Sequence, residues 1–315
     1  MSRAARLSEA ARAPYVARAE PTAPVAAFDV DGRRVELTHP GRVLYPGTGF
    51  TKADLAAYYL DVAPWLLPHL RDRPLTLGRF PGGVDGRGFA QAELPGAAAW
   101  MRTVTLALKN GKTRRFSLVD DRAGLAFLAQ MGVLELHVFL GHPRALDRAA
   151  AIVFDLDPGE GASILEAAKV ALLVRDRLAA RGLAAVPKTS GSVGVHVLAP
   201  LAEPRPYADT RALANDVAAE LAAAHPELVV DRTPRALRRG KVLVDARQNA
   251  ERLTLAAPYT LRATPRPSAS TPVAWGELEA AVAAGDADAL AFAPADVLAR
   301  LATRGDLAAT LISLP

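Results

Sequence analysis

The stretch AAIVFDLDPG, residues 150–159, is an apolar run that ends in two carboxylates and a Pro-Gly turn signal. A short apolar run bounded by a turn signal predicts a buried strand. Because side chains alternate along a strand, Asp155 and Asp157 lie on one face of it, about 7 Å apart. Two carboxylates at the end of an apolar strand are costly unless a positive group lies between them. The stretch therefore predicts a central strand with a cation-binding pair, and a plain turn-capping role for the two acids stays open.

Segments with helical and strand patterns alternate after this strand. Residues 163–182 predict a helix with serine at its N-cap and glycine at its end. Residues 185–201 have the pattern of strand, turn and strand, residues 210–226 predict a second helix, and residues 241–249 predict a further strand. Strands that alternate with helices indicate an α/β protein. Because no internal repeat and no clear linker divides the chain, we expect a single large domain over residues 28–315.

The N-terminal half contains two hairpin signals and one well-marked helix start. Asp31-Gly32 and Asn110-Gly111 each stand between short alternating segments, as the turns of two-residue hairpins do. Thr51 is a good N-cap for a helix over residues 51–70. We expect Pro64 to break or restart this helix, because proline lacks the backbone donor that a helix interior requires.

The composition excludes several kinds of site. There is no cysteine, which excludes disulfides, thiolate zinc sites, iron–sulfur ligation and a cysteine nucleophile. The six histidines share no close metal-type spacing, so an essential metal would have oxygen ligands, as Mg²⁺ and Mn²⁺ do. No apolar run approaches the ~18 residues of a membrane helix, and residues 1–27 lack the apolar core of a secretory signal. We expect a cytoplasmic protein in which residues 1–27 form a loosely ordered leader.

The net charge of +5 is unevenly distributed along the chain. Residues 231–262 contain eight basic residues against three acidic ones, and residues 101–116 contain five basic residues and no acid. Residues 276–315 have the opposite balance, with six acids and two arginines. Such asymmetry indicates a polyanionic partner, either nucleic acid or nucleotide, although ordinary solvated basic faces would give the same counts.

A third carboxylate follows another apolar segment. Asp245 ends the predicted strand KVLVD inside the basic segment. Nucleotidyl-transfer enzymes combine an Asp-x-Asp pair with an acid from a separate strand to hold two metal ions. Haloacid-dehalogenase-type phosphatases also start from Asp-x-Asp, and FDVDG at residues 28–32 shows that pattern, but both segments lack the Thr or Val that normally follows. The nucleotidyl-transfer interpretation is favoured, and a metal-dependent phosphatase using Asp155 and Asp157 is the alternative.

A glycine-rich segment, KTSGSVGVH at residues 188–196, lies between the acids. A Ser-Gly-x-x-Gly turn between two strands exposes backbone N–H groups and hydroxyls that suit an anion. His196 begins the following strand, where it could donate a hydrogen bond to a phosphate. A plain glycine-rich hairpin has the same pattern, so the segment predicts either a phosphate-binding turn or an ordinary one.

Three ordered motifs resemble those of one known family. The segments FDLDPGEG (154–161), KTSGSVGVHV (188–197) and LRRGKVLVDARQN (237–249) followed by APYTLRA (257–263) resemble signature motifs of the polymerase domain of bacterial ligase D. The resemblance extends over the flanking segments, roughly from Val35 to the C-terminus. That domain belongs to the archaeo-eukaryotic primase superfamily and works in non-homologous end joining. The resemblance therefore implies a primase-like mixed β-sheet core flanked by helices.

The resemblance also implies roles for individual residues. Asp155, Asp157 and Asp245 match the metal-binding catalytic triad. The residues that match the nucleotide pocket are Ser190, Gly191, His196, His137, Arg238, Gln248 and Arg262. Arg42 and Lys52 match positions that contact the 5′-phosphate at a DNA gap or break, and Phe89 matches an aromatic residue that packs against the template.

Four positions depart from the family pattern. Val193 stands where lysine is usual, Ala90 replaces the second of two phenylalanines, Ala92 replaces a basic residue, and His39 stands where asparagine is usual. These departures bear on DNA contact and nucleotide affinity and leave the three carboxylates in place.

Together these features predict a stand-alone nucleotidyltransferase that adds nucleotides, ribonucleotides in preference, to DNA 3′-ends. The resemblance implies two Mn²⁺ or Mg²⁺ ions as cofactors, NTPs or dNTPs as substrates, and gap filling or end processing in non-homologous end joining. The expected partners are DNA ends or gapped duplexes with a 5′-phosphate, together with Ku and a separate DNA ligase. We expect no association with a membrane, and we expect the protein to be located at the nucleoid. A degenerate DNA-end-binding module without catalysis is a further alternative, beside the phosphatase.

Overall fold

The structure is a computed structural model that describes residues 25–96, 98–107, 111–141, 145, 147–232 and 234–312. Contacts between Cα atoms divide the chain into two compact units. The first takes in Met1–Val138, Tyr259–Ser268 and Ala293–Gly305, and the second takes in Phe139–Pro258, Ala269–Phe292 and Asp306–Pro315. Within the described residues, no helix has the length and apolar character needed to cross a membrane. The single domain over residues 28–315 stays a prediction, and the predicted leader lies almost wholly outside the described residues, which start with a strand at Val25.

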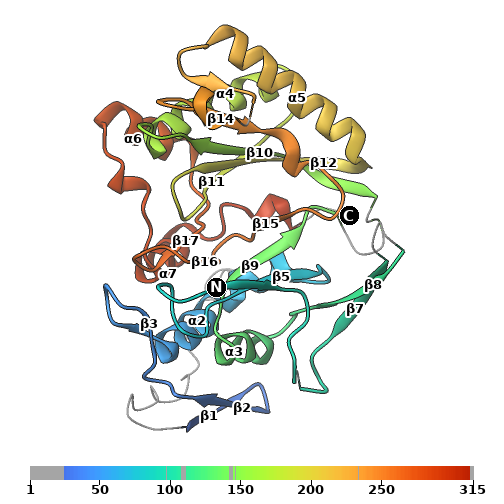
Figure 1. The fold of residues 1–315 in the computed structure, drawn as a ribbon, viewed down its shortest axis with the longest axis vertical. Coiled ribbons are helices and arrows are strands. Elements are labelled where there is room, and N and C mark those ends of the chain that lie inside the picture. The colour runs from blue at the N-terminus through green and yellow to red at the C-terminus, as the bar shows by residue number, and fades with distance from the viewer. Residues whose placement is uncertain are drawn as a thin grey trace, which may run out of the picture. The chain divides into compact units, whose positions relative to one another are not determined.

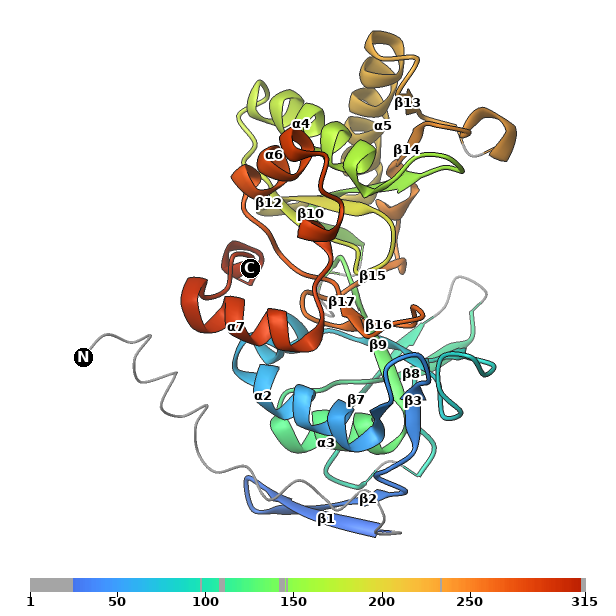
Figure 2. The ribbon, with the colours of Figure 1, turned by 90° about the vertical axis from the view of Figure 1, so that its left-hand side faces the viewer.

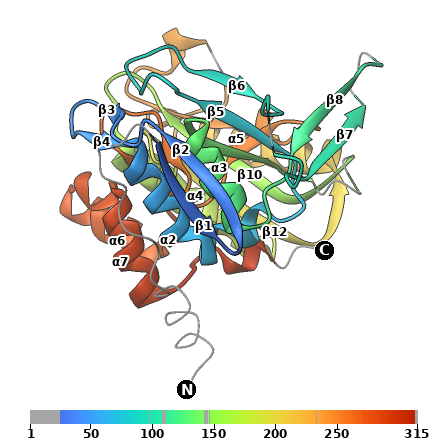
Figure 3. The same ribbon diagram turned by 90° about the horizontal axis from the view of Figure 1, so that it is seen from below.

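The first unit contains a small antiparallel sheet and several two-stranded ribbons (Figures 1 and 3). In the sheet, β5 (Leu75–Arg79) lies between β9 (Val133–Phe139) and β6 (Phe89–Gln91). The ribbons are β1 (Val25–Val30) with β2 (Arg33–Thr38), β3 (Val43–Tyr45) with β4 (Phe50–Thr51), and β7 (Thr103–Ala107) with β8 (Thr113–Ser117). Two later strands are β16 (Leu261–Arg262) and β17 (Ser268–Ala269).

Both predicted hairpins of this unit are confirmed. Asp31 and Gly32 have φ angles of 53° and 76°, the left-handed pair that a type I′ turn between twisted strands requires. Strands β7 and β8 pair in register on either side of the second predicted turn, whose Asn110 lies outside the described residues.

Helix α2 (Lys52–Leu70) begins where the sequence predicts but does not break at Pro64. Thr51 caps it, because the Asp54 N–H donates to Thr51 Oγ1 at 3.2 Å while the Asp54 carboxylate accepts from the Thr51 N–H. The expected break is wrong: the helix continues through Pro64 and Pro68. Each proline removes one backbone hydrogen bond, at a cost of ~3 kcal/mol. Burial of the apolar face of α2 against α3 (Arg122–Gln130) and α7 (Pro294–Arg304) outweighs that cost (Figure 2).

The second unit is built on a five-stranded sheet, and this sheet is mixed, as the family resemblance implies. Its order is β11 (Val186–Thr189), β12 (Val195–Pro206), β10 (Arg148–Pro158), β14 (Val242–Asp245) and β13 (Val229–Val230). Neighbouring strands are antiparallel, except that β13 runs parallel to β14. The predicted strand at residues 150–159 is the central strand β10, and its side chains Ile152, Phe154 and Leu156 are fully buried.

Two helices cover this sheet. Helices α4 (Ile164–Ala179) and α5 (Tyr207–Ala224) pack against each other and against the sheet, and α6 (Trp275–Ala284) packs on α4 (Figures 1 and 2). Ser163 caps α4, as predicted, and Gly182 follows its end with a φ of 71°. The remaining elements are β15 (Thr254–Ala256) and the 3-10 turns η1 (Arg235–Leu237), η2 (Ala246–Gln248), η3 (Asp288–Leu290) and η4 (Ala309–Leu311).

Candidate active site

One row of polar side chains crosses four neighbouring strands of the second unit. The strand register pairs Lys188 on β11 with His196 on β12. On β10, Asp155 pairs with His196 on one side and with Asp245 of β14 on the other. Directly paired residues present their side chains on the same face of a sheet, and Asp157 shares that face because it lies two residues beyond Asp155. The sheet therefore brings all three predicted carboxylates to one place.

The carboxylates stand close enough together to affect one another's ionisation. Burial raises the pKa of Asp157 to about 6, and the negative charge of Asp155 adds to this rise. Burial also disfavours the charged form of Asp155, but its interaction with His196 outweighs this cost and holds the pKa of that carboxyl below its usual value. Burial and the neighbouring carboxylate of Asp155 both disfavour the charged form of Asp157, and a bound cation would offset both effects.

Two arginines provide part of the missing positive charge. Arg247 binds the Asp245 carboxylate with a forked contact, Nε to Oδ1 at 2.9 Å and Nη2 to Oδ2 at 2.5 Å, while its backbone N–H also donates to Oδ1. Arg238 lies farther from Asp157, with Nη2 4.0 Å from Oδ2. The Arg247 side chain is 60% exposed, whereas the Asp245 side chain is 8% exposed. The Arg247 guanidinium therefore contacts a buried carboxylate from the solvent side.

The donor set suits a hard divalent cation. Three carboxylates on neighbouring strands provide oxygen ligands, which Mg²⁺ and Mn²⁺ prefer. As the described side chains stand, no three acidic or histidine residues are gathered tightly enough to enclose an ion. Arg247 contacts both oxygens of Asp245, so its guanidinium competes with a cation for this carboxylate. The residues therefore fit a metal chemically, and Arg247 is a competitor for one of the three carboxylates.

The turn after β14 places Gln248 beside the carboxylates. Gln248 Nε2 donates to Asp155 Oδ2 at 3.4 Å. The next residue, Asn249, is fully buried and bonds both backbone groups of Val153 on β10, accepting at 2.9 Å and donating at 2.6 Å. These paired bonds fix η2 against the central strand, and the sequence reasoning did not identify Asn249 as a site residue.

The glycine-rich turn between β11 and β12 is closed by its own serine. Ser190 Oγ accepts hydrogen bonds from the backbone N–H groups of Ser192 and Gly194, at 3.1 and 3.0 Å. Gly191 has a φ of 71°, which favours glycine. Val193, at the position where lysine is usual, is 62% exposed. The hydroxyl thus serves the turn itself, while residue 193 points into solvent.

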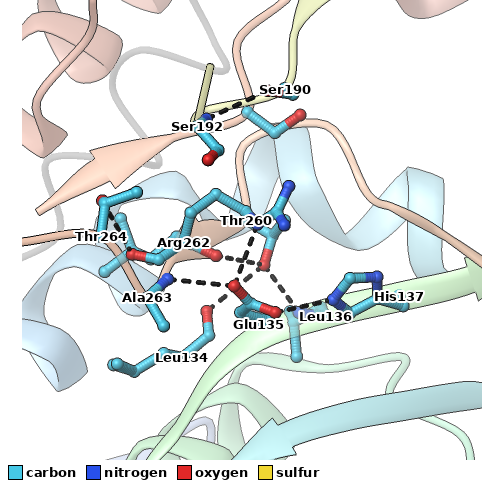
Figure 4. A network of polar contacts seen from close by, with 12 residues as sticks. Leu134, Glu135, Leu136, His137, Ser190, Ser192, Thr260, Arg262, Ala263 and Thr264 are labelled. Atoms are coloured by element: carbon cyan, nitrogen blue, oxygen red, sulfur yellow. Dashed lines mark hydrogen bonds and ion pairs between the residues drawn. The ribbon is translucent and has the colours of Figure 1, made fainter. Parts of the chain in front are cut away.

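Two residues predicted for the nucleotide pocket belong to the first unit and share one carboxylate. Glu135 on β9 contacts His137 Nε2 at 3.0 Å and accepts from Arg262 Nε and the Ala263 backbone N–H, each at 3.0 Å (Figure 4). Burial opposes ionisation of Glu135, but the hydrogen bond from His137 and the charge of Arg262 lower its pKa to about 2. Glu135 therefore holds both predicted residues in place. Its sequence signal is the spacing of two from His137 on a strand, which the sequence reasoning overlooked.

The predicted DNA-binding residues of the first unit differ in their burial and in their hydrogen bonds within the protein. Lys52 is buried, and its Nζ donates to the Thr38 carbonyl and to Gln130 Oε1, both at 2.8 Å. Burial lowers the pKa of Lys52 to about 8, and nearby Arg42 adds to this shift. Arg42 donates to the Pro81 carbonyl at 3.0 Å from an exposed position. Phe89 is 45% exposed, so it is accessible for packing, whereas Lys52 reaches a phosphate only if it gives up internal bonds.

A mixed sheet with two carboxylates on its central strand and a third opposite them is the arrangement expected of an α/β nucleotidyl-transfer enzyme that binds divalent metal ions. A sequence model described as "LigD, primase-polymerase domain" matches residues 51–308. The chain therefore belongs to the LigD primase-polymerase domain family. The solved polymerase domain of Mycobacterium tuberculosis Ligase D in complex with DNA has a TM-score of 0.80 to this structure at 39% identity, over 90% of this chain and 99% of that one.

Curated relatives are considerably longer than this chain. The multifunctional non-homologous end joining DNA repair protein LigD of Mycobacterium tuberculosis is 40% identical over 284 residues, 87% of this chain and 36% of the relative. The multifunctional non-homologous end joining protein LigD of Pseudomonas aeruginosa is 31% identical over 253 residues, 78% of this chain and 29% of the relative. The chain thus spans about a third of the length of these relatives. These similarities confirm the family that the three motifs indicate and do not favour the phosphatase.

Proposed function

We propose that this chain is a metal-dependent nucleotidyltransferase that adds nucleotides to the 3′-hydroxyl of DNA at gaps or broken ends. The observation that carries the proposal is the direct pairing of Asp155 with Asp245 across β10 and β14, with Asp157 on the same face. Divalent ions held there, Mn²⁺ or Mg²⁺, would lower the pKa of the attacking hydroxyl and neutralise charge on the leaving pyrophosphate. His196 and Gln248 would orient Asp155, to which both are bonded.

The proposed partner is DNA with a 5′-phosphate at the gap or break. The basic segment 231–262 and the likeness to a polymerase domain solved with DNA support this partner. Phosphate contacts provide affinity that falls with added salt. Relatives named as non-homologous end joining proteins support end processing as the setting. Ku and a separate DNA ligase are the proposed protein partners, and the nucleoid is the proposed location.

A primer-extension assay tests the proposed function. The purified chain is mixed with Mn²⁺ and a gapped duplex that has either a 5′-phosphate or a 5′-hydroxyl, with rNTPs or dNTPs, at one fixed salt concentration. We expect extension with pyrophosphate release, faster with rNTPs, and tighter binding of the phosphorylated gap. Release of inorganic phosphate without extension would favour a phosphatase, and DNA binding without extension would favour a non-catalytic end-binding module.

Replacing Arg247 is expected to tighten metal binding. In Arg247→Gln the forked contact with Asp245 is lost, so a divalent ion no longer competes with a guanidinium for both oxygens. A charge-assisted forked pair is worth about 1.5 kcal/mol, so Mn²⁺ affinity should rise about 10-fold. Calorimetric titration of Mn²⁺ in the absence of nucleotide and DNA measures this effect.

A matched control separates this competition from a change in net charge. Arg232→Gln removes one charge from the same basic segment, where Arg232 lies beside Asp231 with Nε 3.8 Å from Oδ1. We expect its Mn²⁺ affinity to stay within twofold of the unmodified protein. Equal Mn²⁺ affinity in both variants would contradict the competition between Arg247 and the ion.

A further inference from the structure

A buried lysine stands at the outer end of the polar row, and the proposed chemistry gives it no task. Lys188 is fully buried on β11, next to His196 on β12. Its Nζ lies 2.7 Å from His196 Nδ1 and 2.5 Å from Ser270 Oγ. Enclosing an amine of this kind is costly unless its donors are all used, so a specific arrangement of hydrogen bonds must stabilise it.

The donors and acceptors in these hydrogen bonds follow from the hydrogen bond that Ser270 makes. Ser270 Oγ donates its single proton to the Thr189 carbonyl at 2.9 Å. Ser270 therefore accepts from Lys188 Nζ, and the lysine, whose ammonium has donors only, also donates to His196 Nδ1. With Nδ1 as an acceptor, the ring proton of His196 is on Nε2.

The other nitrogen of the imidazole faces the catalytic carboxylate. His196 Nε2 lies 3.2 Å from Asp155 Oδ1, so the Nε2 proton is donated to that oxygen. The opposite tautomer would place an unprotonated nitrogen against a carboxylate, two acceptors without a proton between them. The geometry at both ends of the ring thus selects the same tautomer.

We propose that Lys188 is a positioning residue that sets the tautomer of His196 and, through it, the orientation of Asp155. The inference rests on the proposed function, in which Asp155 is a metal ligand. His196 holds Oδ1, and the contact from Gln248 Nε2 to Oδ2 is long at 3.4 Å, so Oδ2 is the oxygen that would be presented to a divalent ion. Partners behind a metal ligand typically change affinity or activity by about 10- to 100-fold when removed. This assigns His196 a role behind Asp155, beside the nucleotide contact that the family resemblance implies.

The tautomer can be measured on the unmodified protein. In a sample with ¹⁵N-labelled histidine, the His196 resonances are identified as those that His196→Gln lacks, and long-range proton–nitrogen spectra show which ring nitrogen has the proton. We expect the proton on Nε2 and an unprotonated Nδ1. A proton on Nδ1 would overturn the proposal, whether or not the chain extends primers.

Three lysine variants then test the role of Lys188 itself. Lys188→Met keeps the length of the side chain but removes the donor, and Lys188→Gln keeps an N–H donor for Nδ1 without the charge. Lys169→Met removes an exposed lysine of α4 that pairs with Glu166 and serves as the control. We expect only Lys188→Met to lose the single tautomer, and to lower kcat about 10- to 100-fold with little change in the KM for nucleotide.

These experiments distinguish a failure of the Lys188 proposal from a failure of the proposed function. If the unmodified chain adds no nucleotides, the proposed function fails, while the histidine spectra still decide the tautomer. If Lys188→Met does not fold, Lys188→Gln and the spectrum of the unmodified protein still decide the proposal. An unchanged tautomer in folded Lys188→Met, or loss of kcat in Lys188→Gln equal to that in Lys188→Met, would overturn the role of Lys188.

Discussion

Replacing Asp245 with alanine is expected to lower nucleotide addition by on the order of 10³-fold or more, which corresponds to the several kcal/mol that a bound metal contributes to a transition state. The variant loses the carboxylate that faces Asp155 across the sheet. It also frees the Arg247 guanidinium from its internal partner, so DNA affinity should stay equal or rise. Single-turnover primer extension with Mn²⁺ measures the first effect, and fluorescence anisotropy of a labelled gapped duplex at fixed salt measures the second.

The control for Asp245→Ala is an acid remote from the row. Asp209→Ala removes an exposed carboxylate from the first turn of α5 and gives the same change in net charge. Its extension rate should stay within twofold of the unmodified protein. If Asp245→Ala extends primers at the rate of Asp209→Ala, the three-carboxylate assignment is wrong.

Short-range patterns predicted most of what the sequence could show. The alternation of side chains along a strand put Asp155 and Asp157 on one face, and an apolar strand ending in Asp245 predicted a third carboxylate at the same sheet. The order of the strands could not be derived in this way, because it is set by pairings between residues far apart in the chain. The resemblance to a family implied a mixed sheet, which is confirmed, but it did not give the order of the strands.

The hydrogen-bond and ion-pair partners of most charged side chains could not be predicted from the sequence. Nothing in the sequence shows that Lys188 is buried against His196, or that the Lys52 amine is held by Gln130, because both contacts depend on packing between separate elements. The forked contact from Arg247 to Asp245 is local, and the spacing of two residues was a usable signal for it. Pro64 shows the opposite error, in which a strong local rule is overridden by the burial of α2.

The second large effect is expected at Gly194, which directly precedes β12 and lies close against β10. A Cβ atom added to Gly194 would lie 2.4 Å from the backbone carbonyl oxygen of Leu156, the residue between Asp155 and Asp157. Real side chains do not approach a backbone oxygen so closely, and neither strand can move without disturbing the pairing of His196 with Asp155. Gly194→Ala should therefore lower the free energy of unfolding by about 1 to 3 kcal/mol and reduce extension strongly.

Glycine 194 needs its lack of a side chain for packing and not for an unusual backbone angle. It is absent from the glycines of the described chain that have positive φ, so alanine could adopt its backbone conformation and the close approach alone accounts for the expected loss. Gly276→Ala in α6 is the matched control, because its added Cβ would have no atom within 4 Å. Urea unfolding followed by circular dichroism should show a lower midpoint for Gly194→Ala and no loss for Gly276→Ala. Equal midpoints would mean that β10 and β12 can separate freely at this point, and the row from Lys188 to Asp245 would then not depend on their close contact.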